Sequence, residues 1–406
     1  MQKDASYYRP ISIIPVLARL LEKVAAGQLY EYCDARGIIP EQQFGFRKRS
    51  SCEMALIAAM ESWRQSLDEG EMVGALLIDL SKAFDTVPHE MLLKEMSSIG
   101  CGGKALDWFE DYLTGRQQRV VQGRILTAWK AVTRGFPQGG GLSPLMFNVF
   151  VRKMPMLKTI QFADDITHSA ASKYLEVILN ELTEIFRKTE LFCLEHGLRV
   201  NSSKTQLLIL KSPARQIPEE FELILDGCHI RPEKTVKLLG VTLDQHLTFA
   251  QHIDGVVRKC HGLLSLLWRA SRFLPRELLR MAYVAIVRSR IEYASALFAG
   301  AAKTHLEKMD RIQRMAARIV CGVPRQAHSA PLLEALNLQT LASRRTKHIL
   351  DLVNSILQEE CHPAFRDFFR VDGEGEIVVS HQAKKRVGAR RFCFQGAEVF
   401  NKNVTR

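Results

Sequence analysis

Three aspartates in this chain could carry out metal-dependent phosphoryl transfer. Asp164 and Asp165 are adjacent between two short apolar runs, and Asp79 ends the apolar run 72–79. Carboxylate oxygens without His or Cys suit Mg²⁺. Two like charges about 5 Å apart repel by roughly 3 kcal/mol at an effective dielectric of about 20, so a cluster of them is tolerated chiefly around cations. We interpret the three acids as a candidate two-metal site. The alternative for Asp-Asp alone is a solvated turn.

Strands must position these acids. The run 72–79 is typical of a buried strand, and the runs 156–162 and 166–169 predict two strands joined by a tight turn at Asp-Asp. A turn is required because neighbouring residues of one strand point to opposite faces. If these strands pair, the three carboxylates crowd one spot.

The region from residue 71 to about 245 alternates strands with helices. The further elements predicted there are a helix with Pro88 in its first turn, strand-like stretches 119–122 and 129–133, a helix 145–151 capped by Ser143 and started by Pro144, a helix 174–196 ended by Gly197, and a strand 206–211.

A basic loop joins two predicted helices near the start of the chain. An amphipathic pattern predicts a helix over 16–34, closed by Gly37. Three cations at 47–49 then precede a second helix, with Ser50 and Glu53 fitting a capping box. Cations beside the free N–H groups of a helix N-terminus could cradle phosphate. A solvated basic turn is the alternative.

Composition points to a polyanionic partner. The chain has 406 residues, 47% of them hydrophobic, and carries a net charge of +12. Nucleic acid is the first candidate and an anionic membrane surface the second. No apolar run reaches the length of a membrane span and no signal-peptide core opens the chain, so we expect a cytoplasmic or nuclear protein that is not secreted. Nine scattered cysteines without a Cys-x-x-Cys predict reduced, mostly buried thiols.

The last third of the chain reads as basic and helical. Leucine-rich faces predict helices over approximately 252–273, 275–298, 304–320 and 340–360. Arginines on their other faces, Arg311 and Arg314 among them, could contact a nucleic-acid backbone, with solvated helix faces as the alternative. Residues 371–406 predict a basic, flexible tail.

Taken in order, these stretches resemble the reverse transcriptases of non-LTR (LINE-type, jockey-like) retrotransposons, from Tyr8 to about Phe369. The resemblance rests on Tyr8-Arg-Pro-Ile-Ser12 with Gln43-Phe-Gly-Phe-Arg47, Asp79-Leu-Ser-Lys-Ala-Phe84-Asp85, Pro137-Gln-Gly139 with Leu142-Ser-Pro144, Phe162-Ala-Asp-Asp165, Gly197-Leu-Arg-Val-Asn201 with Lys204-Thr205, and Leu238-Leu-Gly240-Val-Thr-Leu-Asp244. It implies an α+β right-hand polymerase fold. Fingers would occupy 1–71, a split βαβ palm 72–245, and an all-α thumb with a C-terminal helical region 246–370.

The resemblance also implies RNA-directed DNA polymerase activity, a nucleotidyl transfer to a primer 3′-hydroxyl on an RNA template. Asp79, Asp164 and Asp165 would bind two Mg²⁺ ions, for which Mn²⁺ could substitute, with Asp164 the more direct ligand of the adjacent pair. Lys204 would lie near the departing pyrophosphate and protonate it. The partners would be RNA template, DNA primer, their hybrid and deoxynucleoside triphosphates.

Further roles follow from the same resemblance. The nucleotide would contact Arg47, Arg49, Phe84, Gln138 and Gly139, with the Phe84 ring under the sugar. The nucleic acid would contact Leu239 and Gly240 in the primer-grip stretch and Arg311 and Arg314 in the thumb. For Phe84 the alternative is simple core packing.

Two departures from the family pattern bear on activity. Gly140 follows Pro-Gln-Gly where the family has Ser, and the connector 152–161 is several residues shorter than in relatives, which could displace the Asp-Asp turn from Asp79. Because the chain starts at the fingers, we expect a truncated form without the upstream endonuclease. The alternative functions are a catalytically inactive nucleic-acid-binding remnant and a host RNA-binding factor of maturase type.

Overall fold

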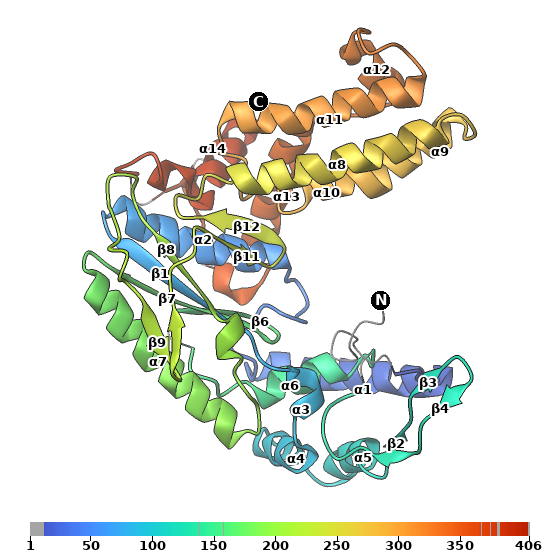
Figure 1. The fold of residues 1–406 in the computed structure, drawn as a ribbon, viewed down its shortest axis with the longest axis vertical. Coiled ribbons are helices and arrows are strands. Elements are labelled where there is room, and N and C mark those ends of the chain that lie inside the picture. The colour runs from blue at the N-terminus through green and yellow to red at the C-terminus, as the bar shows by residue number, and fades with distance from the viewer. Residues whose placement is uncertain are drawn as a thin grey trace.

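The computed structural model describes residues 12–137, 139–156, 158–366, 368–373, 375–379 and 382–404. Residues 8–11 of the first motif and Gln138, a predicted nucleotide contact, lie outside the described residues. A small sheet lies at the middle of the molecule, between helices below it and a mainly helical part above it (Figure 1). This α+β arrangement agrees with the predicted fold class.

The central sheet has four antiparallel strands in the order β6-β7-β1-β8. Their bounds are Thr159–Phe162 for β6, Asp165–Ser172 for β7, Met72–Ile78 for β1 and Gln206–Leu210 for β8. The sequence predicted all four. β1 lies between two neighbours and is almost wholly buried, which explains its unbroken apolar sequence.

Helices cover both faces of this sheet. Helix α7 (Leu175–Glu195) packs on the face of Leu76 and Ile78, and helix α2 (Cys52–Asp68) packs on the other. Gly74 lets α7 approach closely, because a Cβ there would lie 2.4 Å from Cγ2 of Ile178.

The N-terminal elements agree with the sequence except at one cap. Helix α1 (Val16–Ala35) ends before Gly37, which has a φ of 59°. Helix α2 is capped by Ser51, whose hydroxyl accepts from the N–H of Met54 at 3.1 Å. The predicted capping box of Ser50 and Glu53 is therefore wrong. The Glu53 carboxylate instead accepts from the N–H of Ala296 at 3.0 Å. This long-range contact joins α2 to the helical region, and a local pattern cannot predict it.

The lower part of the molecule holds helices α3 (Ala83–Thr86), α4 (His89–Ser98), α5 (Lys104–Leu113) and α6 (Ser143–Phe150). Pro88 immediately precedes α4. Ser143 was predicted to cap α6, but it lies inside the helix and its hydroxyl donates to the Pro137 carbonyl at 3.1 Å. The segment between α5 and α6 forms two small ribbons, from β2 (Gln117–Gln118), β3 (Val121–Gln122), β4 (Ile125–Leu126) and β5 (Lys130–Ala131).

Beyond α7 the chain forms a short 3-10 turn, strand β8 and two hairpins. The turn is η2 (Ser202–Lys204), and the hairpin strands are β9 (Leu223–Leu225), β10 (Cys228–Ile230), β11 (Thr235–Leu238) and β12 (Val241–Asp244).

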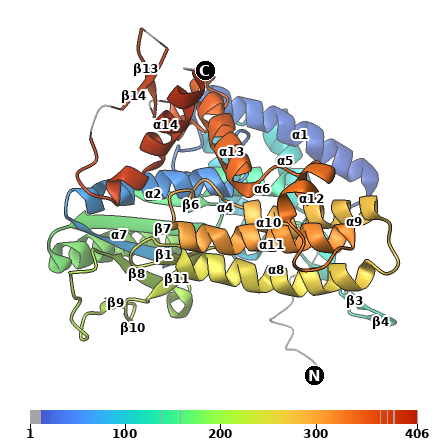
Figure 2. The same ribbon diagram turned by 90° about the horizontal axis from the view of Figure 1, so that it is seen from above.

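The upper part contains helices α8 (Ala250–Ala270), α9 (Arg276–Ala282), α10 (Ser289–Glu292), α11 (Lys303–Cys321), α12 (Ser329–Ala335) and α13 (Leu341–Leu357). Helices α8 and α11 lie side by side (Figure 2). The predicted single helix 275–298 is instead interrupted by a π-helical segment, Tyr283–Arg288, and stops at Glu292. Its apolar stretch continues in sequence but packs as a buried turn, where Ala294 has a φ of 54°.

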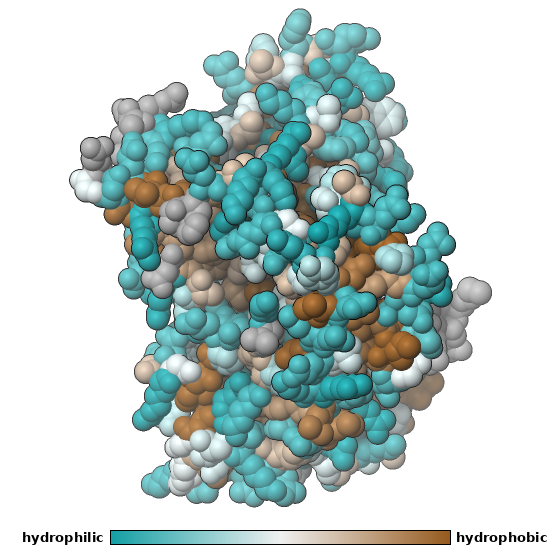
Figure 3. Space-filling view, turned by 90° about the vertical axis from the view of Figure 1, so that its left-hand side faces the viewer, coloured by the Kyte–Doolittle hydropathy of each residue, from teal (hydrophilic) through white to brown (hydrophobic). Residues whose placement is uncertain are grey.

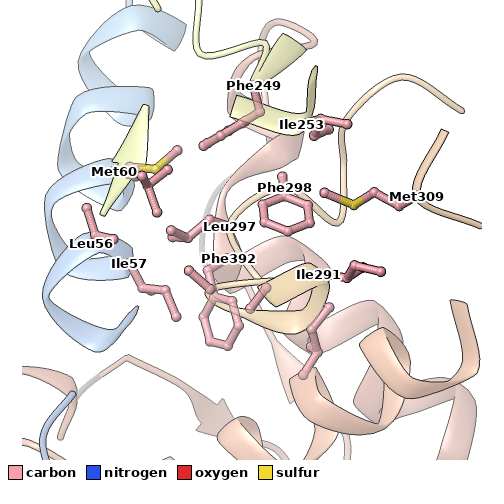
Figure 4. Close-up of a cluster of buried hydrophobic side chains, with 14 of the residues drawn as sticks. Leu56, Ile57, Met60, Phe249, Ile253, Ile291, Leu297, Phe298, Met309 and Phe392 are labelled. Atoms are coloured by element: carbon pink, nitrogen blue, oxygen red, sulfur yellow. The ribbon is translucent and has the colours of Figure 1, made fainter. Parts of the chain in front are cut away.

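The prediction of a flexible tail over 371–406 is wrong for residues 392–404. After the short strands β13 (Arg370–Val371) and β14 (Ile377–Val378), residues Phe392–Val404 form helix α14. Phe392 lies in the same buried cluster as Leu56 and Ile57 of α2 (Figure 4). The charged run before α14 dominated the sequence pattern. Its backbone is held by Asp68, which accepts from the N–H groups of Lys384 and Lys385 at 2.9 and 2.5 Å.

All nine cysteines are free and five of them are buried, as predicted. Within the described ranges, no helix combines the length and the apolar character that crossing a bilayer requires. One face of the molecule is mainly hydrophilic, with apolar residues in scattered patches (Figure 3).

Candidate active site

Asp79 and Asp165 lie at the same end of the central sheet. Strands β1 and β7 pair in register up to Ile78 and Ile166, so Asp79 follows the last paired residue of one strand and Asp165 precedes its partner. Opposed residues of antiparallel strands share a face, and both aspartates line one cavity together with Leu77. The short connector therefore does not shift the Asp-Asp turn out of register with Asp79.

The adjacent aspartates are separated by the turn that the sequence predicted. Phe162 pairs with Asp165, which leaves Ala163 and Asp164 as a two-residue loop between β6 and β7. Ala163 has a φ of 59°, a value typical of tight hairpin turns and uncommon for a residue with a side chain. Asp164 is half-buried on the loop, whereas Asp165 is exposed.

A buried glutamine holds this turn. The side-chain oxygen of Gln43 accepts hydrogen bonds from the N–H groups of Ala163 and Gly45, both at 2.8 Å. The backbone beside it joins β6, since the Phe44 N–H donates to the Gln161 carbonyl at 2.8 Å. Sequence reasoning placed Gln43 in a motif and missed this role. Its partner Ala163 lies 120 residues away in the sequence, so no local signal could have revealed the contact.

Gly45 leaves no room for a side chain. A Cβ added there would lie 2.3 Å from the Ala163 nitrogen and 2.9 Å from the Phe162 carbonyl carbon. The Gly45 carbonyl accepts from the Asn148 amide at 2.8 Å, which links the same loop to α6. The position of the Asp-Asp turn thus depends on the loop at 43–45.

The C-terminal region contacts this loop through His362, which sequence reasoning also missed. Its ring is fully buried and stacks on Phe44 with 4.0 Å between centroids. Burial lowers the pKa of His362 to about 4, so the imidazole is neutral. Its Nδ1 accepts from the N–H of Ala364 at 3.3 Å, so Nε2 carries the proton and donates to the Gln43 carbonyl at 3.1 Å.

The cavity beside the aspartates has a volume of about 440 Å³. Its lining comes from the ends of β1 and β7, from η2 and the start of β8, and from the β11–β12 hairpin with Glu233 before it. Lys204 lies in this lining, with its Nζ 3.6 Å from Oδ2 of Asp79. The Asn201 amide donates to the same oxygen at 3.4 Å. Asp165 belongs to the lining and Asp164 does not.

The carboxylates meet by backbone position rather than as a closed cluster. Within the part of the chain that the structure describes, no three His, Cys, Asp or Glu side chains are spaced to hold one metal ion. Like charges repel, and the ammonium of Lys204 attracts Asp79 instead. The structure therefore brings Asp79 and Asp165 to one cavity, whereas Asp164 lies on the adjoining loop.

Comparison with known proteins decides the family. A family model described as "Reverse transcriptase (RNA-dependent DNA polymerase)" matches residues 1–243, which include every aspartate of the candidate site. The chain belongs to the reverse transcriptase family. The resemblance drawn from the motifs is thereby confirmed.

Curated relatives of this chain include proteins named as retrotransposon polymerases in Drosophila. The chain is 28% identical to a "Probable RNA-directed DNA polymerase from transposon BS" of Drosophila melanogaster, over 86% of this chain and 40% of that protein. It is 25% identical to the "RNA-directed DNA polymerase from mobile element jockey" of Drosophila funebris, over 79% and 36%. The chain thus spans about 40% of the length of such relatives.

Solved structures give a more distant likeness. A telomerase from Candida albicans, in complex with a fragment of telomeric RNA, matches 80% of this reverse transcriptase and 59% of its own chain. The TM-score is 0.42 at 12% sequence identity.

The predicted primer-grip residues of the reverse transcriptase form the turn of a hairpin. Leu239 and Gly240 connect β11 to β12 with φ values of 44° and 84°, which is the backbone that a two-residue hairpin loop needs. Leu239 lines the cavity. The Tyr293 hydroxyl donates to the Leu239 carbonyl at 2.7 Å, so the helical region fixes the hairpin beside the aspartates.

Four of the five predicted nucleotide contacts belong to the described residues, and these four lie outside the cavity lining. Phe84 is half-buried and stacks on Phe147 with 4.5 Å between ring centroids. Arg47 donates to the Pro40 carbonyl at 3.0 Å, and Arg49 donates to the Glu359 carbonyl at 3.2 Å. Gly139 has a φ of 104° in the loop before α6. The structure does not bring these four residues together with Asp79.

The two predicted thumb arginines share one acidic partner. Arg311 is 69% exposed with its Nε 3.8 Å from Glu307, and Arg314 forms a closer ion pair with the same carboxylate. Both lie on α11, away from the aspartates in sequence and absent from the cavity lining.

Acidification is expected to destabilise the reverse transcriptase fold. Burial lowers the pKa values of His168, His252 and His362 from the ordinary 6.5 to about 4. His168 lies on β7, where Thr159 and Thr189 hold its ring at 2.7 and 2.9 Å. Below pH 6.5 the unfolded chain binds protons that the folded chain does not, so the free energy of unfolding falls until about pH 4. Each histidine contributes up to about 3 kcal/mol to that fall.

Urea denaturation between neutral pH and about pH 5 would measure this fall. The half-buried pair of His348 with Glu53 acts in the opposite sense, since it raises the pKa of His348. A free energy of unfolding that stays level over this range would contradict the assignment of three neutral, buried histidines.

Proposed function

We propose that this chain is an RNA-directed DNA polymerase that adds deoxynucleotides to the 3′-hydroxyl of a primer on an RNA template. One observation carries the proposal: Asp79 and Asp165, from opposed strands, line one cavity with Lys204. Family membership supports it, because the matched region contains the whole site. We found no observation that favours the inactive remnant.

The donor set suits divalent metal ions of the Mg²⁺ type. Asp79, Asp164 and Asp165 offer only carboxylate oxygens, and the cavity lining contains neither His nor Cys. We propose that these three aspartates hold two Mg²⁺ ions, or Mn²⁺ in their place. When bound, the ions would activate the primer hydroxyl and neutralise charge on the departing pyrophosphate.

The residues of the chain would do the remaining work. The strand pairing of β1 with β7 would align the carboxylates, and the Gln43 loop would keep the Asp-Asp turn in register. Lys204, exposed at the cavity edge, would exchange its contact with Asp79 for the departing phosphate and donate a proton there. Asn201 would continue to orient Asp79.

Nucleotide and primer contacts complete the proposal. Phe84, held by the rings of Phe147, Phe136 and Phe46, would present a rigid surface to the sugar. Gln138 and Gly139 would line the nucleotide pocket. Arg47 and Arg49 would bind the triphosphate. Each guanidinium would give up its present hydrogen bond to a backbone carbonyl and donate to phosphate oxygens instead.

The nucleic acid would lie along the hairpin and the helical region. Leu239 and Gly240 would guide the primer end, since Leu239 lines the same cavity as Asp79. Arg311 and Arg314 would contact the backbone of the RNA–DNA hybrid, with the more exposed Arg311 contributing more.

Primer extension tests the function directly. The purified chain, an RNA template with an annealed DNA primer, the four deoxynucleotides and Mg²⁺ should give products that lengthen with time. Chelation of the metal should stop extension, and added Mg²⁺ should restore it. A folded protein that binds the hybrid with steep salt dependence and never extends the primer would contradict the proposal.

A further inference from the structure

The ribbon at 116–134 buries almost none of its own surface. It consists of the two small two-stranded ribbons one after the other: β2 pairs with β5 at its base, and β3 pairs with β4 toward its tip at Gly123-Arg124. Every residue from 117 to 134 is exposed except Val132, which is half-buried. Isolated two-stranded ribbons are marginally stable in water, so an ordered one with both faces open is suited to receive a partner. In Figure 1 it extends from the lower part of the molecule beyond the end of α1.

The ribbon carries only positive charge. It contains five basic residues and neither Asp nor Glu. Among the ion pairs of the described residues, none involves one of these five cations. The basic residues are Arg116, Arg119, Arg124, Lys130 and Arg134. Cations without acidic neighbours, held on a narrow ribbon, favour a polyanionic ligand.

Apolar side chains alternate with these cations. Val120, Val121, Ile125, Leu126 and Trp129 are between 56% and 69% exposed. The Arg119 guanidinium lies 4.5 Å from the centre of the Trp129 ring, a distance typical of a cation–π contact. Exposed apolar and aromatic groups among cations suit a ligand with both phosphates and accessible flat rings. Single-stranded nucleic acid has both, whereas a duplex hides its base faces.

We propose that this ribbon is a binding site for single-stranded RNA, namely the template before it is copied. The inference rests on the proposed function for the word template, while the binding of single-stranded RNA rests on the ribbon alone. Arg119, Arg124 and Lys130 contact phosphates, and Trp129 stacks on a base. An isolated antiparallel bridge between Pro88 and Arg134 joins the base of the ribbon to the segment that follows Asp85. RNA bound along the ribbon would therefore lead toward the palm.

The test measures RNA binding apart from catalysis. Fluorescence anisotropy of a labelled single-stranded RNA, over a series of salt concentrations, compares the parent with the triple variant Arg119→Ala, Arg124→Ala, Lys130→Ala. The variant should bind about tenfold or more weakly at low salt, and the slope of log affinity against log salt should fall by about 2. The matched control removes three exposed lysines, Lys94→Ala, Lys188→Ala and Lys402→Ala, and should bind like the parent.

A second pair of variants tests the stacking. Trp129→Ala should weaken binding about fivefold to a hundredfold, and Trp129→Phe should restore most of it. RNA carrying thiouridine should form photo-crosslinks to peptides within 116–134. Because the altered residues are exposed, the unfolding midpoints of all variants should match the parent.

Three outcomes would overturn the inference. The first is equal RNA affinity for the ribbon variant and its lysine control. The second is equal loss of binding to the RNA–DNA hybrid and to the single strand, which would indicate a duplex contact. The third is an absence of crosslinks in the ribbon, which would leave a protein partner as its occupant. If the parent protein extends no primer but the ribbon variants lose RNA binding as predicted, the proposed function is refuted. The assignment of the ribbon as a binding site for single-stranded RNA then still holds.

Discussion

Replacing Asp79 by Asn is expected to lower the rate of primer extension by at least about a thousandfold, with little change in the free energy of unfolding. Asn removes a negative charge from the cavity while keeping the size of the side chain, and its remaining amide oxygen can still accept the hydrogen bond from Asn201. A metal ion at a phosphoryl-transfer site supplies several kcal/mol of charge stabilisation, and about 4 kcal/mol corresponds to a thousandfold in rate. Asp79 is partly exposed and follows its strand, so the sheet does not depend on its charge. Single-nucleotide incorporation under pre-steady-state conditions would measure the effect.

Glu233→Gln is the matched control for Asp79→Asn. Glu233 lines the same cavity, but its carboxylate is occupied by the Gln206 amide at 2.8 Å. Its neutralisation should change the rate by less than about threefold, a free-energy change below about 1 kcal/mol. If both variants lost activity equally, the loss at Asp79 would reflect the net charge of the cavity rather than a ligand to metal.

The same assay distinguishes the two adjacent aspartates. The family resemblance implies that Asp164 is the more direct metal ligand, whereas the cavity lining contains Asp165. If Asp164 is a direct metal ligand, Asp164→Asn should lower the rate of incorporation as much as Asp79→Asn does. A greater loss for Asp165→Asn would show that the lining identifies the ligand correctly.

The sequence predicted the strands and the turn that carry the aspartates better than the contacts that hold them in place. The strand 72–78 and the Asp-Asp turn could be predicted because local signals determine them: an unbroken apolar run and a polar pair between two strands. Gln43 and His362 could not be predicted, since each acts through a partner more than a hundred residues away in sequence. No local pattern encodes such a contact.

The predictions for the helical region and for the C-terminal tail were wrong for a related reason. The charged run before Phe392 predicted flexibility, yet Arg391 pairs with Glu61 at 2.7 Å and the N–H of Phe392 donates to the same carboxylate at 2.8 Å. These charges are satisfied by α2, an element at the other end of the chain. The same contacts explain why α2 and the C-terminal helices share one buried cluster, and why the C-terminal region can influence the active site.

Gly45→Ala is expected to reduce the rate of primer extension by about a hundredfold. The added methyl group would meet the Ala163 nitrogen at 2.3 Å, and backbone cannot rotate away as a flexible side chain can. The loop at 43–45 and the Asp-Asp turn must therefore separate, which also stretches the hydrogen bond from the Ala163 N–H to the side-chain oxygen of Gln43. A displacement of about 1 Å in such a site costs on the order of a hundredfold in rate. The free energy of unfolding should fall by about 1–3 kcal/mol, the usual cost of overpacking a buried site.

Two measurements separate displacement of the turn from general unfolding. Urea denaturation gives the loss of stability, and single-nucleotide incorporation on folded protein gives the rate of the chemical step. Gly27→Ala is the control, because its Cβ meets nothing within 4 Å on α1 and alanine favours a helix. That variant should keep full activity. A Gly45→Ala protein that is destabilised yet incorporates nucleotides at the parental rate would show that the Gln43 loop supports the fold without setting the position of Asp164.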